Sequence, residues 1–239
     1  MITKTEAIVL HTLKYGEQKV IVDMFTRVCG RLSFIVTIPK TGKGQMKKPY
    51  LQPLSLLEVS FDQRQQVQLQ RLQNARLLVP YVSVYSSPDK LSIALFIAEY
   101  LYYALRSEQR NEPLFDYIAD SLQWLDAARD GVANFHLTFL MRLSKFLGFY
   151  PRLAVGGDLF DLREGTFCSA APTHPDFLQD REAEMVRLLM RMDFATMRLF
   201  KFSRGERQRV LEVLMRYYQL HLPNFPEMKS LAVLQEMYS

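Results

Sequence analysis

Residues 19–38, KVIVDMFTRVCGRLSFIVTI, predict a β-hairpin. The second half alternates apolar and polar side chains, which is the period of a strand with one buried face. Its apolar positions are Leu32, Phe34, Val36 and Ile38. The first half, 19–26, is rich in β-branched and apolar residues, and the RVCG between the halves ends in Gly30, which suits a tight turn. We therefore expect two paired strands here, with Phe34 in the core.

Three further strands flank this hairpin within the first 80 residues. They are predicted at TEAIVLHTL (5–13), LSLLEVSF (54–61) and QVQLQRLQ (66–73). Five short antiparallel strands in about 75 residues favour a closed barrel over a sandwich, because closure removes exposed strand edges. The sequence therefore predicts a five-stranded oligonucleotide-binding (OB) β-barrel domain over residues 1–80.

From residue 81 the apolar residues recur at the three- and four-residue steps of amphipathic helices. Helices are predicted at about 86–108, 113–128, 132–147 and 203–222, with a short final helix after PNFP. Ser203 and Glu206 have the spacing of a capping box at the start of one of them. The segment near 151–175 is expected to be an irregular hairpin or loop. Residues 81–239 are therefore predicted to form an α-helical domain, which makes the fold α+β with two domains.

The composition indicates a globular protein of a reducing compartment. The chain has 239 residues, 49% of them hydrophobic, which is enough for one large core or two modest ones. No apolar run of about 18 residues is present, and the N-terminus lacks the features of a signal peptide. Cys29 and Cys168, far apart in sequence, cannot form a disulfide framework. We expect a cytoplasmic protein with no membrane association.

Positive charge is concentrated in the first third of the chain. Residues 1–80 hold 12 Lys and Arg against 5 Asp and Glu, whereas residues 81–239 hold 18 against 20. A surplus confined to one segment suggests a polyanionic partner for that segment. A solubilising surface explains the charge equally well.

The clearest feature within this basic segment is PKTGKGQMKKPYLQP, residues 39–53, which has four lysines and no acid. Its two glycines would let the backbone approach a ligand closely, and lysines that neutralise phosphates release counterions, which favours binding. We expect phosphate contacts from this loop and from neighbouring strands, with Tyr15 and Tyr50 as residues that could stack on bases. The predicted DNA-binding residues are Arg31, Lys40, Lys43, Lys47 and Lys48, with Arg71 and Arg76 as weaker candidates. The alternative is a surface hairpin whose lysines only keep a strand edge soluble.

A second basic cluster lies near the start of the helix predicted at 203–222. It comprises Arg198, Lys201, Arg204 and Arg207, with Arg209 nearby. Such a cluster could hold an acidic C-terminal peptide or a DNA phosphate. It could equally be a solvated helix face that pairs with Glu206 and Glu212.

Catalytic and metal-binding patterns are missing from the sequence. The four histidines fall in separate predicted elements, and no metalloprotease, nucleophile-elbow or phosphate-loop motif is present. Asp158 and Asp161 lie close together and would be the carboxylates of a metal-dependent hydrolase, but such a pair in a loop is more often solvated. We expect no enzymatic activity, no metal and no cofactor.

Several segments together resemble the bacterial RecO family. The N-terminal block with Thr12, Tyr15, Gly16 and Glu17, followed by Thr26, Gly30 and Arg31, is similar to that family's opening. LQPLSLLEV, FLGFYPRL, FDLREGTF and HLPNFPEMKSLAVLQEM continue the resemblance in order along the chain. Many relatives carry a four-cysteine zinc motif after the segment that corresponds to FLGFYPRL. This chain has only Cys168 there, so zinc is not carried over.

The resemblance implies both a fold and a function. The fold is an N-terminal OB barrel followed by an α-helical domain. The implied function is DNA repair and recombination: binding of single- and double-stranded DNA, strand annealing, and assistance to RecA loading with RecR in the RecF pathway, at the nucleoid. The implied partners are DNA, RecR, the C-terminal tail of single-strand-binding protein, RecF and RecA. The alternative is a protein-interaction scaffold whose helical domain binds partners, with no direct DNA role for the lysine loop.

Overall fold

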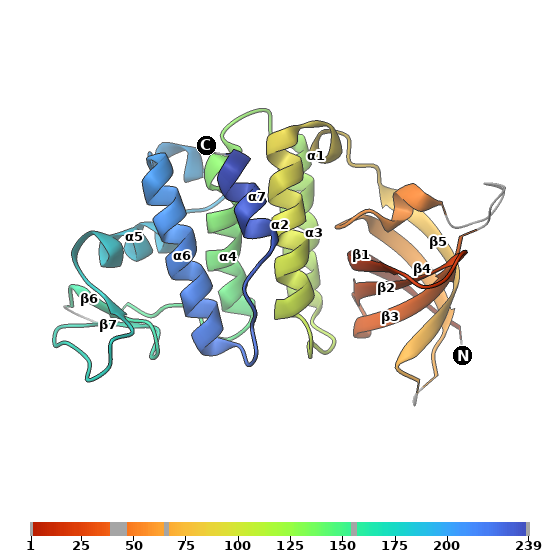
Figure 1. The fold of residues 1–239 in the computed structure, drawn as a ribbon, viewed down its shortest axis with the longest axis horizontal. Helices are drawn as coiled ribbons and strands as arrows, with labels where there is room; N and C mark the ends of the chain where they lie inside the picture. Colours follow the sequence, from red (N-terminus) through yellow and green to blue (C-terminus); the bar gives the residue numbers. More distant parts are fainter. Residues whose placement is uncertain (1, 39–46, 65–66, 154–156, 238–239) are drawn as a thin grey trace. The chain divides into compact units, whose positions relative to one another are not determined.

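The structure, a computed structural model, describes residues 2–38, 47–64, 67–153 and 157–237 (Figure 1). It divides into two compact units. The first comprises Met1–Ala127 together with Met228–Leu234, and the second comprises Ala128–Glu227 together with Gln235–Ser239.

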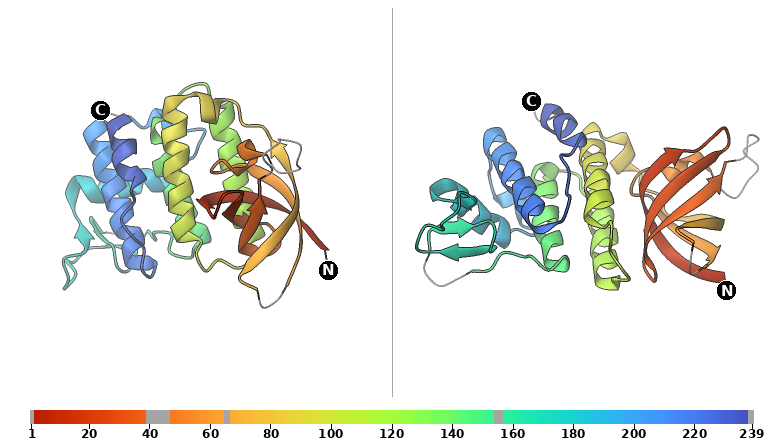
Figure 2. Two further views of the ribbon diagram at one scale, coloured as in Figure 1. Left: turned by 45° about the vertical axis from the view of Figure 1, so that its right-hand side comes forward. Right: turned by 60° about the horizontal axis from the view of Figure 1, so that its bottom comes forward.

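The predicted barrel is confirmed. Its strands are β1 (Ile2–Lys14), β2 (Lys19–Thr26), β3 (Gly30–Thr37), β4 (Leu56–Asp62) and β5 (Leu69–Val79). They close in the order β1-β2-β3-β5-β4. Figure 2 shows this barrel in two further views. The prediction that all strands are antiparallel was wrong at one pairing, because β3 and β5 run parallel. Strand β4 lies between them in sequence and pairs with β1, so β5 returns beside β3 in the same direction.

The barrel interior is filled by alternate residues of the strands. The fully buried side chains include Val9, Val22, Phe34, Leu57 and Phe61. The rings of Phe34 and Phe61 meet edge to face with their centroids 5.0 Å apart. The prediction that Phe34 belongs to the core is therefore confirmed.

Three helices follow the barrel within the first unit, namely α1 (Ser83–Ser86), α2 (Pro88–Ala104) and α3 (Glu112–Ala127). They cover part of the outer surface of the barrel, where Ile8 and Leu10 of β1 are buried although they point away from its interior. Phe25 of β2 packs against Phe115 of α3 with ring centroids 6.0 Å apart. The same strands thus contribute one face to the barrel core and part of the other face to a second core.

The partly buried carboxylate of Asp126 links the end of α3 to the start of α1. The carboxylate of Asp126, at the end of α3, accepts hydrogen bonds from the backbone N–H groups of Val82, Ser83 and Val84 at the start of α1. Burial alone would raise the pKa of Asp126, but these backbone donors outweigh it and hold the pKa below its usual range. The buried Lys90 ammonium donates to Ser83 Oγ at 2.7 Å and to the Asp126 carbonyl oxygen at 3.1 Å.

The second unit contains α4 (Phe135–Phe146), α5 (Asp180–Arg191), α6 (Arg204–His221) and a small sheet of β6 (Leu159–Asp161), β7 (Thr166–Cys168) and β8 (Phe177–Leu178). Short 3-10 turns lie at η2 (Val132–Asn134) and η3 (Met197–Leu199), and α7 (Ser230–Met237) ends the described chain. The capping box of Ser203 and Glu206 is present as predicted. Helix α5 was not predicted, although its residues have a strongly amphipathic spacing.

We expect Gly30→Ala to destabilise the protein by at least about 3 kcal/mol, because it adds a steric clash to the cost of a left-handed backbone. Gly30 has a φ of +71°, and a Cβ there would lie 2.5 Å from the Gln109 carbonyl carbon. Gly16→Ala is the control, since Gly16 has a φ of +85° with open space around it and should cost only about 1–2 kcal/mol. Urea unfolding measures both variants, and equal losses would contradict the proposed close approach.

We expect stability to fall as the pH drops below 6.5, because of His136 in α4. Burial, and to a smaller extent the positive charge of Arg207, lower the pKa of His136 to about 3. The unfolded chain therefore binds a proton that the folded chain does not, and the free energy of unfolding falls by up to about 1.4 kcal/mol per pH unit below 6.5. Denaturant titrations between pH 7 and pH 5 should show a shallower slope for His136→Gln than for the unmodified protein. Identical slopes for the two proteins would rule out this role of His136.

Candidate nucleic-acid interface

Four exposed lysines gather at one end of the barrel, and we call them the lysine rim: Lys14, Lys19, Lys47 and Lys48. The backbone N–H of Tyr15 donates to the Lys19 carbonyl at 2.9 Å, which closes the turn between β1 and β2. At the same end, the hydroxyl of Thr12 donates to the carbonyl oxygen of Leu51, 3.1 Å away. Leu51 belongs to η1 (Lys48–Leu51), which begins directly after Lys47. The turn and η1 therefore bring lysines from three separate segments to one rim.

The lysine rim includes part of the predicted lysine loop. Lys47 and Lys48 are exposed, whereas Lys40 and Lys43 lie outside the described residues. The N–H of Ile38 donates to the carbonyl of Gln18 at 2.8 Å, so the chain leaves β3 beside the same turn of the rim. Sequence reasoning did not select Lys14 and Lys19 as candidate contacts, although both flank the turn after the first predicted strand. No acid pairs with the four rim lysines within the part of the chain that the structure describes.

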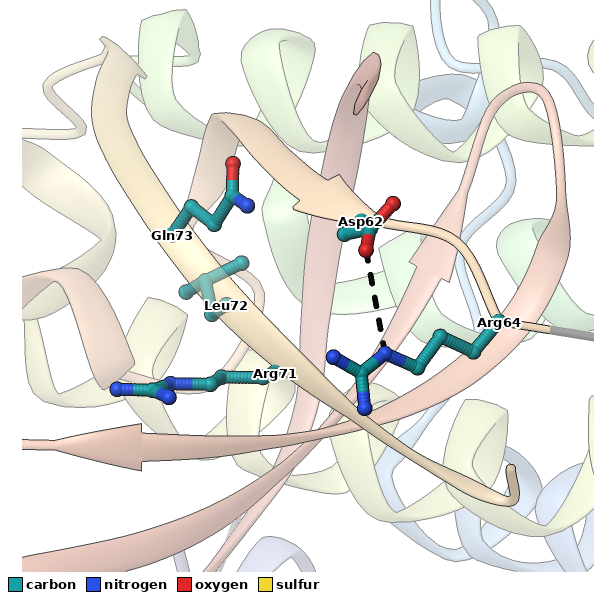
Figure 3. Close-up of a pocket in the computed structure, with 5 residues that line it drawn as sticks. All are labelled: Asp62, Arg64, Arg71, Leu72 and Gln73. Carbon is teal, nitrogen blue, oxygen red and sulfur yellow. Dashed lines mark ion pairs between the residues drawn. The ribbon is translucent and has the colours of Figure 1, made fainter. Parts of the chain in front are cut away.

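Arg64 and Arg71 line a hollow of about 350 Å³ on the outside of β4 and β5. The other lining residues are Asp62, Leu72 and Gln73. Figure 3 shows Arg64 turned toward Asp62, whose carboxylate lies 3.9 Å from the guanidinium, while Arg71 extends away from that acid. Arg71 is exposed and lies directly across from Ile35 of β3. Register places its backbone two strands and two residues from Lys19, which is roughly 12 Å at ordinary strand spacings. Arg71 thus flanks the same surface as the rim.

Arg76 has its charge partly compensated. Its guanidinium lies 3.3 Å from Glu58, and the same carboxylate lies 3.1 Å from the Lys4 ammonium. The bond from Lys4 and the charges of both cations hold the pKa of Glu58 below its ordinary value. These three groups carry a net charge of one, so Arg76 contributes less to a basic surface than Arg71 does.

The side chain of Arg31 is poorly exposed, unlike those of Arg71 and Arg76. Its side chain is 12% exposed, and its guanidinium lies 3.5 Å from Asp23 and 4.5 Å from the ring centroid of Tyr102. It also donates to the Tyr102 carbonyl oxygen. The charge of Arg31 is already neutralised and its donors are engaged, so we do not include it among the proposed phosphate contacts.

The two predicted stacking residues differ in exposure. Tyr15 is 55% exposed beside the rim, so its ring is accessible. Tyr50 is partly buried and packs against the barrel core. Only Tyr15 therefore presents an open aromatic face.

In the second unit, Arg198, Lys201 and Arg204 are exposed and follow one another along η3 and the start of α6. Arg207 is half-buried and donates to the Phe202 carbonyl at 2.6 Å. Arg209 pairs with Glu182 and Glu212. Arg207 and Arg209 thus have local partners, which leaves the first three as the accessible part of the predicted cluster.

Asp158 and Asp161 do not form a shared site. Asp158 is exposed, whereas the carboxylate of Asp161 accepts from the backbone N–H groups of Arg163 and Glu164 and lies 3.3 Å from His174. Asp161 therefore stabilises the turn between β6 and β7. Among the described residues, no group of three or more His, Cys, Asp or Glu is placed to hold a metal ion. Burial raises the pKa of the Cys29 thiol, which disfavours the nucleophilic thiolate.

The fold and this surface define a class: an OB-barrel protein with basic residues on its barrel and a helical C-terminal region. The sequence matches the family models described as Recombination protein O N terminal, over residues 1–81, and Recombination protein O C terminal, over residues 85–231. The chain belongs to the RecO family. It is 47% identical to DNA repair protein RecO of Bacteroides fragilis, 46% to that of Phocaeicola vulgatus and 35% to that of Porphyromonas gingivalis, each over 100% of both chains.

Among the described residues, no helix has the length and apolar character needed to cross a bilayer.

We expect Arg31→Ala to lower the free energy of unfolding by about 2–4 kcal/mol, because it leaves the poorly exposed Asp23 carboxylate without its cation. Arg71→Ala is the matched control on the same barrel surface and should change stability by no more than about 0.5 kcal/mol. Urea unfolding of the two variants tests the assignment. A stable Arg31→Ala protein would return this residue to the set of ligand contacts.

Proposed function

We propose that this protein is a DNA repair and recombination mediator that binds single- and double-stranded DNA through its barrel, without catalysing a reaction. The observation that carries the proposal is the lysine rim, whose four cations are exposed and lack acid partners among the described residues. Arg71 and Arg64 extend this surface along the outside of the barrel. Lys40 and Lys43 remain predicted contacts, since they lie between Ile38 and Lys47 in the sequence. Membership in the RecO family and the names of the relatives support the same function.

The rim suits annealing because annealing needs charge neutralisation rather than bond chemistry. Two complementary strands repel each other through their phosphates. A surface that screens both strands raises their rate of encounter, and base pairing then selects the correct partner. The side chains involved bind phosphate without reading sequence, so one protein can act on any pair of complementary strands.

We further propose that DNA binding and partner binding are carried out by different segments of the chain, which meet near residue 80. The two family models also meet there, between residues 81 and 85. The barrel segment would bind DNA, and the helical segment would hold protein partners. From the family resemblance, these partners are RecR, RecF, RecA and the C-terminal tail of single-strand-binding protein, with assistance to RecA loading as the outcome. Work of this kind places the protein on DNA in the cytoplasm.

A second function, a protein-interaction scaffold, is favoured by the accessible part of the cluster in the second unit. Leu199, which is 70% exposed, directly follows Arg198 and lies two and five residues before Lys201 and Arg204 in the sequence. Cations beside an exposed leucine suit an acidic peptide with apolar residues better than they suit a phosphate backbone. Both functions can coexist, because they use different segments of the chain.

We expect the double variant Lys47→Gln and Lys48→Gln to weaken binding of single-stranded DNA and to flatten its salt dependence. Each lost phosphate contact should reduce the slope of log affinity against log salt by about 0.7, so the pair should reduce it by about 1.4. Fluorescence anisotropy with a labelled oligonucleotide, repeated at several salt concentrations, measures both quantities.

The control removes the same charge elsewhere. Arg181 and Arg209 each lie 2.5 Å from an acid, Glu206 and Glu182 respectively. The double variant Arg181→Gln and Arg209→Gln should keep the slope of the unmodified protein. Equal slopes for all three proteins would remove the rim from the DNA interface and favour the scaffold function.

A further inference from the structure

A poorly exposed carboxylate lies between two arginines at the small sheet of the second unit. Asp176 is 8% exposed and directly precedes β8. Its Oδ2 accepts a hydrogen bond from Nε of Arg163 at 2.7 Å, and its Oδ1 accepts from the guanidinium of Arg216 at 2.8 Å. Arg163 lies in the turn between β6 and β7, whereas Arg216 belongs to α6. The carboxylate of Asp176 therefore joins a turn of the sheet to a helix. We call Arg163, Asp176 and Arg216 the arginine clamp.

A second carboxylate orders the turn that carries Arg163. Asp161 is 7% exposed and accepts from two backbone N–H groups of this turn, at 2.8 and 3.1 Å. Its other oxygen lies 3.3 Å from His174. The backbone N–H of Leu162 donates to the carbonyl oxygen of Asp176 at 3.0 Å. The turn is thus fixed by its own hydrogen bonds, which position Arg163 for the clamp.

The apolar contacts of the sheet are few. Its strands are only two or three residues long. The ring of Phe160 lies 4.9 Å from that of Phe167 within the sheet and 5.9 Å from that of Tyr217 in α6. Such short strands bury little apolar surface and are marginally stable without further support. The ionic contacts to α6 therefore supply a large part of what holds the sheet in place.

The donor set of this segment does not fit a structural metal ion. The family resemblance implies a four-cysteine zinc motif here in many relatives, and structural zinc needs about four ligands. This chain has Cys168 alone in the segment. Among the described residues no group of three or more His, Cys, Asp or Glu is placed to hold a metal, and the undescribed residues 154–156 are Ala, Val and Gly. Both oxygens of Asp176 face guanidinium groups, whose charge would repel a cation.

We propose that the arginine clamp holds the small sheet on α6 and takes the role that a zinc ion would have in relatives with four cysteines. Each oxygen of Asp176 has its own guanidinium, so both hydrogen bonds are charge-assisted. The side chains of Arg163 and Arg216 are 50% and 53% exposed and keep part of their hydration, which limits the cost of desolvation. The fold of this segment therefore depends neither on the supply of a metal nor on the oxidation state of cysteines.

The ionisation of Asp176 is consistent with this role. The hydrogen bonds from Arg216 and Arg163 hold the pKa of the carboxyl below its usual range. The carboxylate is therefore charged at neutral pH, and the clamp is closed.

The first experiment removes the charge of the clamp with little change of shape. In Asp176→Asn an amide N–H₂ replaces one acceptor, so one arginine loses its partner. We expect amide hydrogen exchange in residues 159–178 to become about tenfold faster or more, while exchange in the barrel strands stays unchanged. Mass spectrometry of peptides from the full-length protein measures both. Asp158→Asn is the matched control, because Asp158 is an exposed acid that directly precedes β6.

A double-mutant cycle tests whether the two ends of the clamp act on each other. Arg216→Gln alone should also accelerate exchange in residues 159–178. Combined with Asp176→Asn, it should add much less than its separate effect, because the interaction is already lost. If Asp176→Asn does not fold, Arg163→Gln and Arg216→Gln form the cycle, since each removes only one of the two arginines.

The second experiment measures metal on the unmodified protein. We expect elemental analysis to find much less than one zinc per chain, and a chelator to leave exchange in residues 159–178 unchanged. About one bound metal per chain, whose removal accelerates exchange in this segment, would overturn the proposal. Exchange in Asp176→Asn equal to that in Asp158→Asn would also overturn it, as would full additivity in the cycle.

Discussion

The side chain of Arg31 determines which part of the barrel remains open. Its guanidinium joins Asp23 of β2 to the ring and carbonyl of Tyr102 in α2, and its backbone N–H donates to the Glu108 carbonyl at 3.1 Å. The adjacent Gly30 allows the chain after α2 to approach the turn more closely than any side chain would permit. These contacts hold α2 over the outward positions near the β2–β3 turn. The positions at the other ends of the same strands stay uncovered, and there the exposed cations lie.

Burial decides the role of each arginine on this barrel. Arg31 is nearly enclosed, where an unpaired charge would be costly, so its positive charge is neutralised by Asp23. Arg71 is exposed to water, so its charge needs no acid partner and is accessible to a ligand. Arg76 is also exposed, but its charge is partly compensated because it shares Glu58 with Lys4. Arginines on one surface thus divide into neutralised and accessible cations according to the acids and helices around them.

The barrel could be predicted from the sequence because its strands and turns are marked by patterns among neighbouring residues. Alternation in 31–38, the turn at Gly30 and the spacing of five strands identify both the strands and the buried Phe34. The parallel pairing of β3 with β5 could not be predicted in the same way, since it depends on contacts between segments far apart in the chain. The same limit applies to Arg31, because its partner Tyr102 lies 71 residues away. Lys14 and Lys19 were missed for a related reason: only the closed barrel brings the β1–β2 turn beside Lys47 and Lys48.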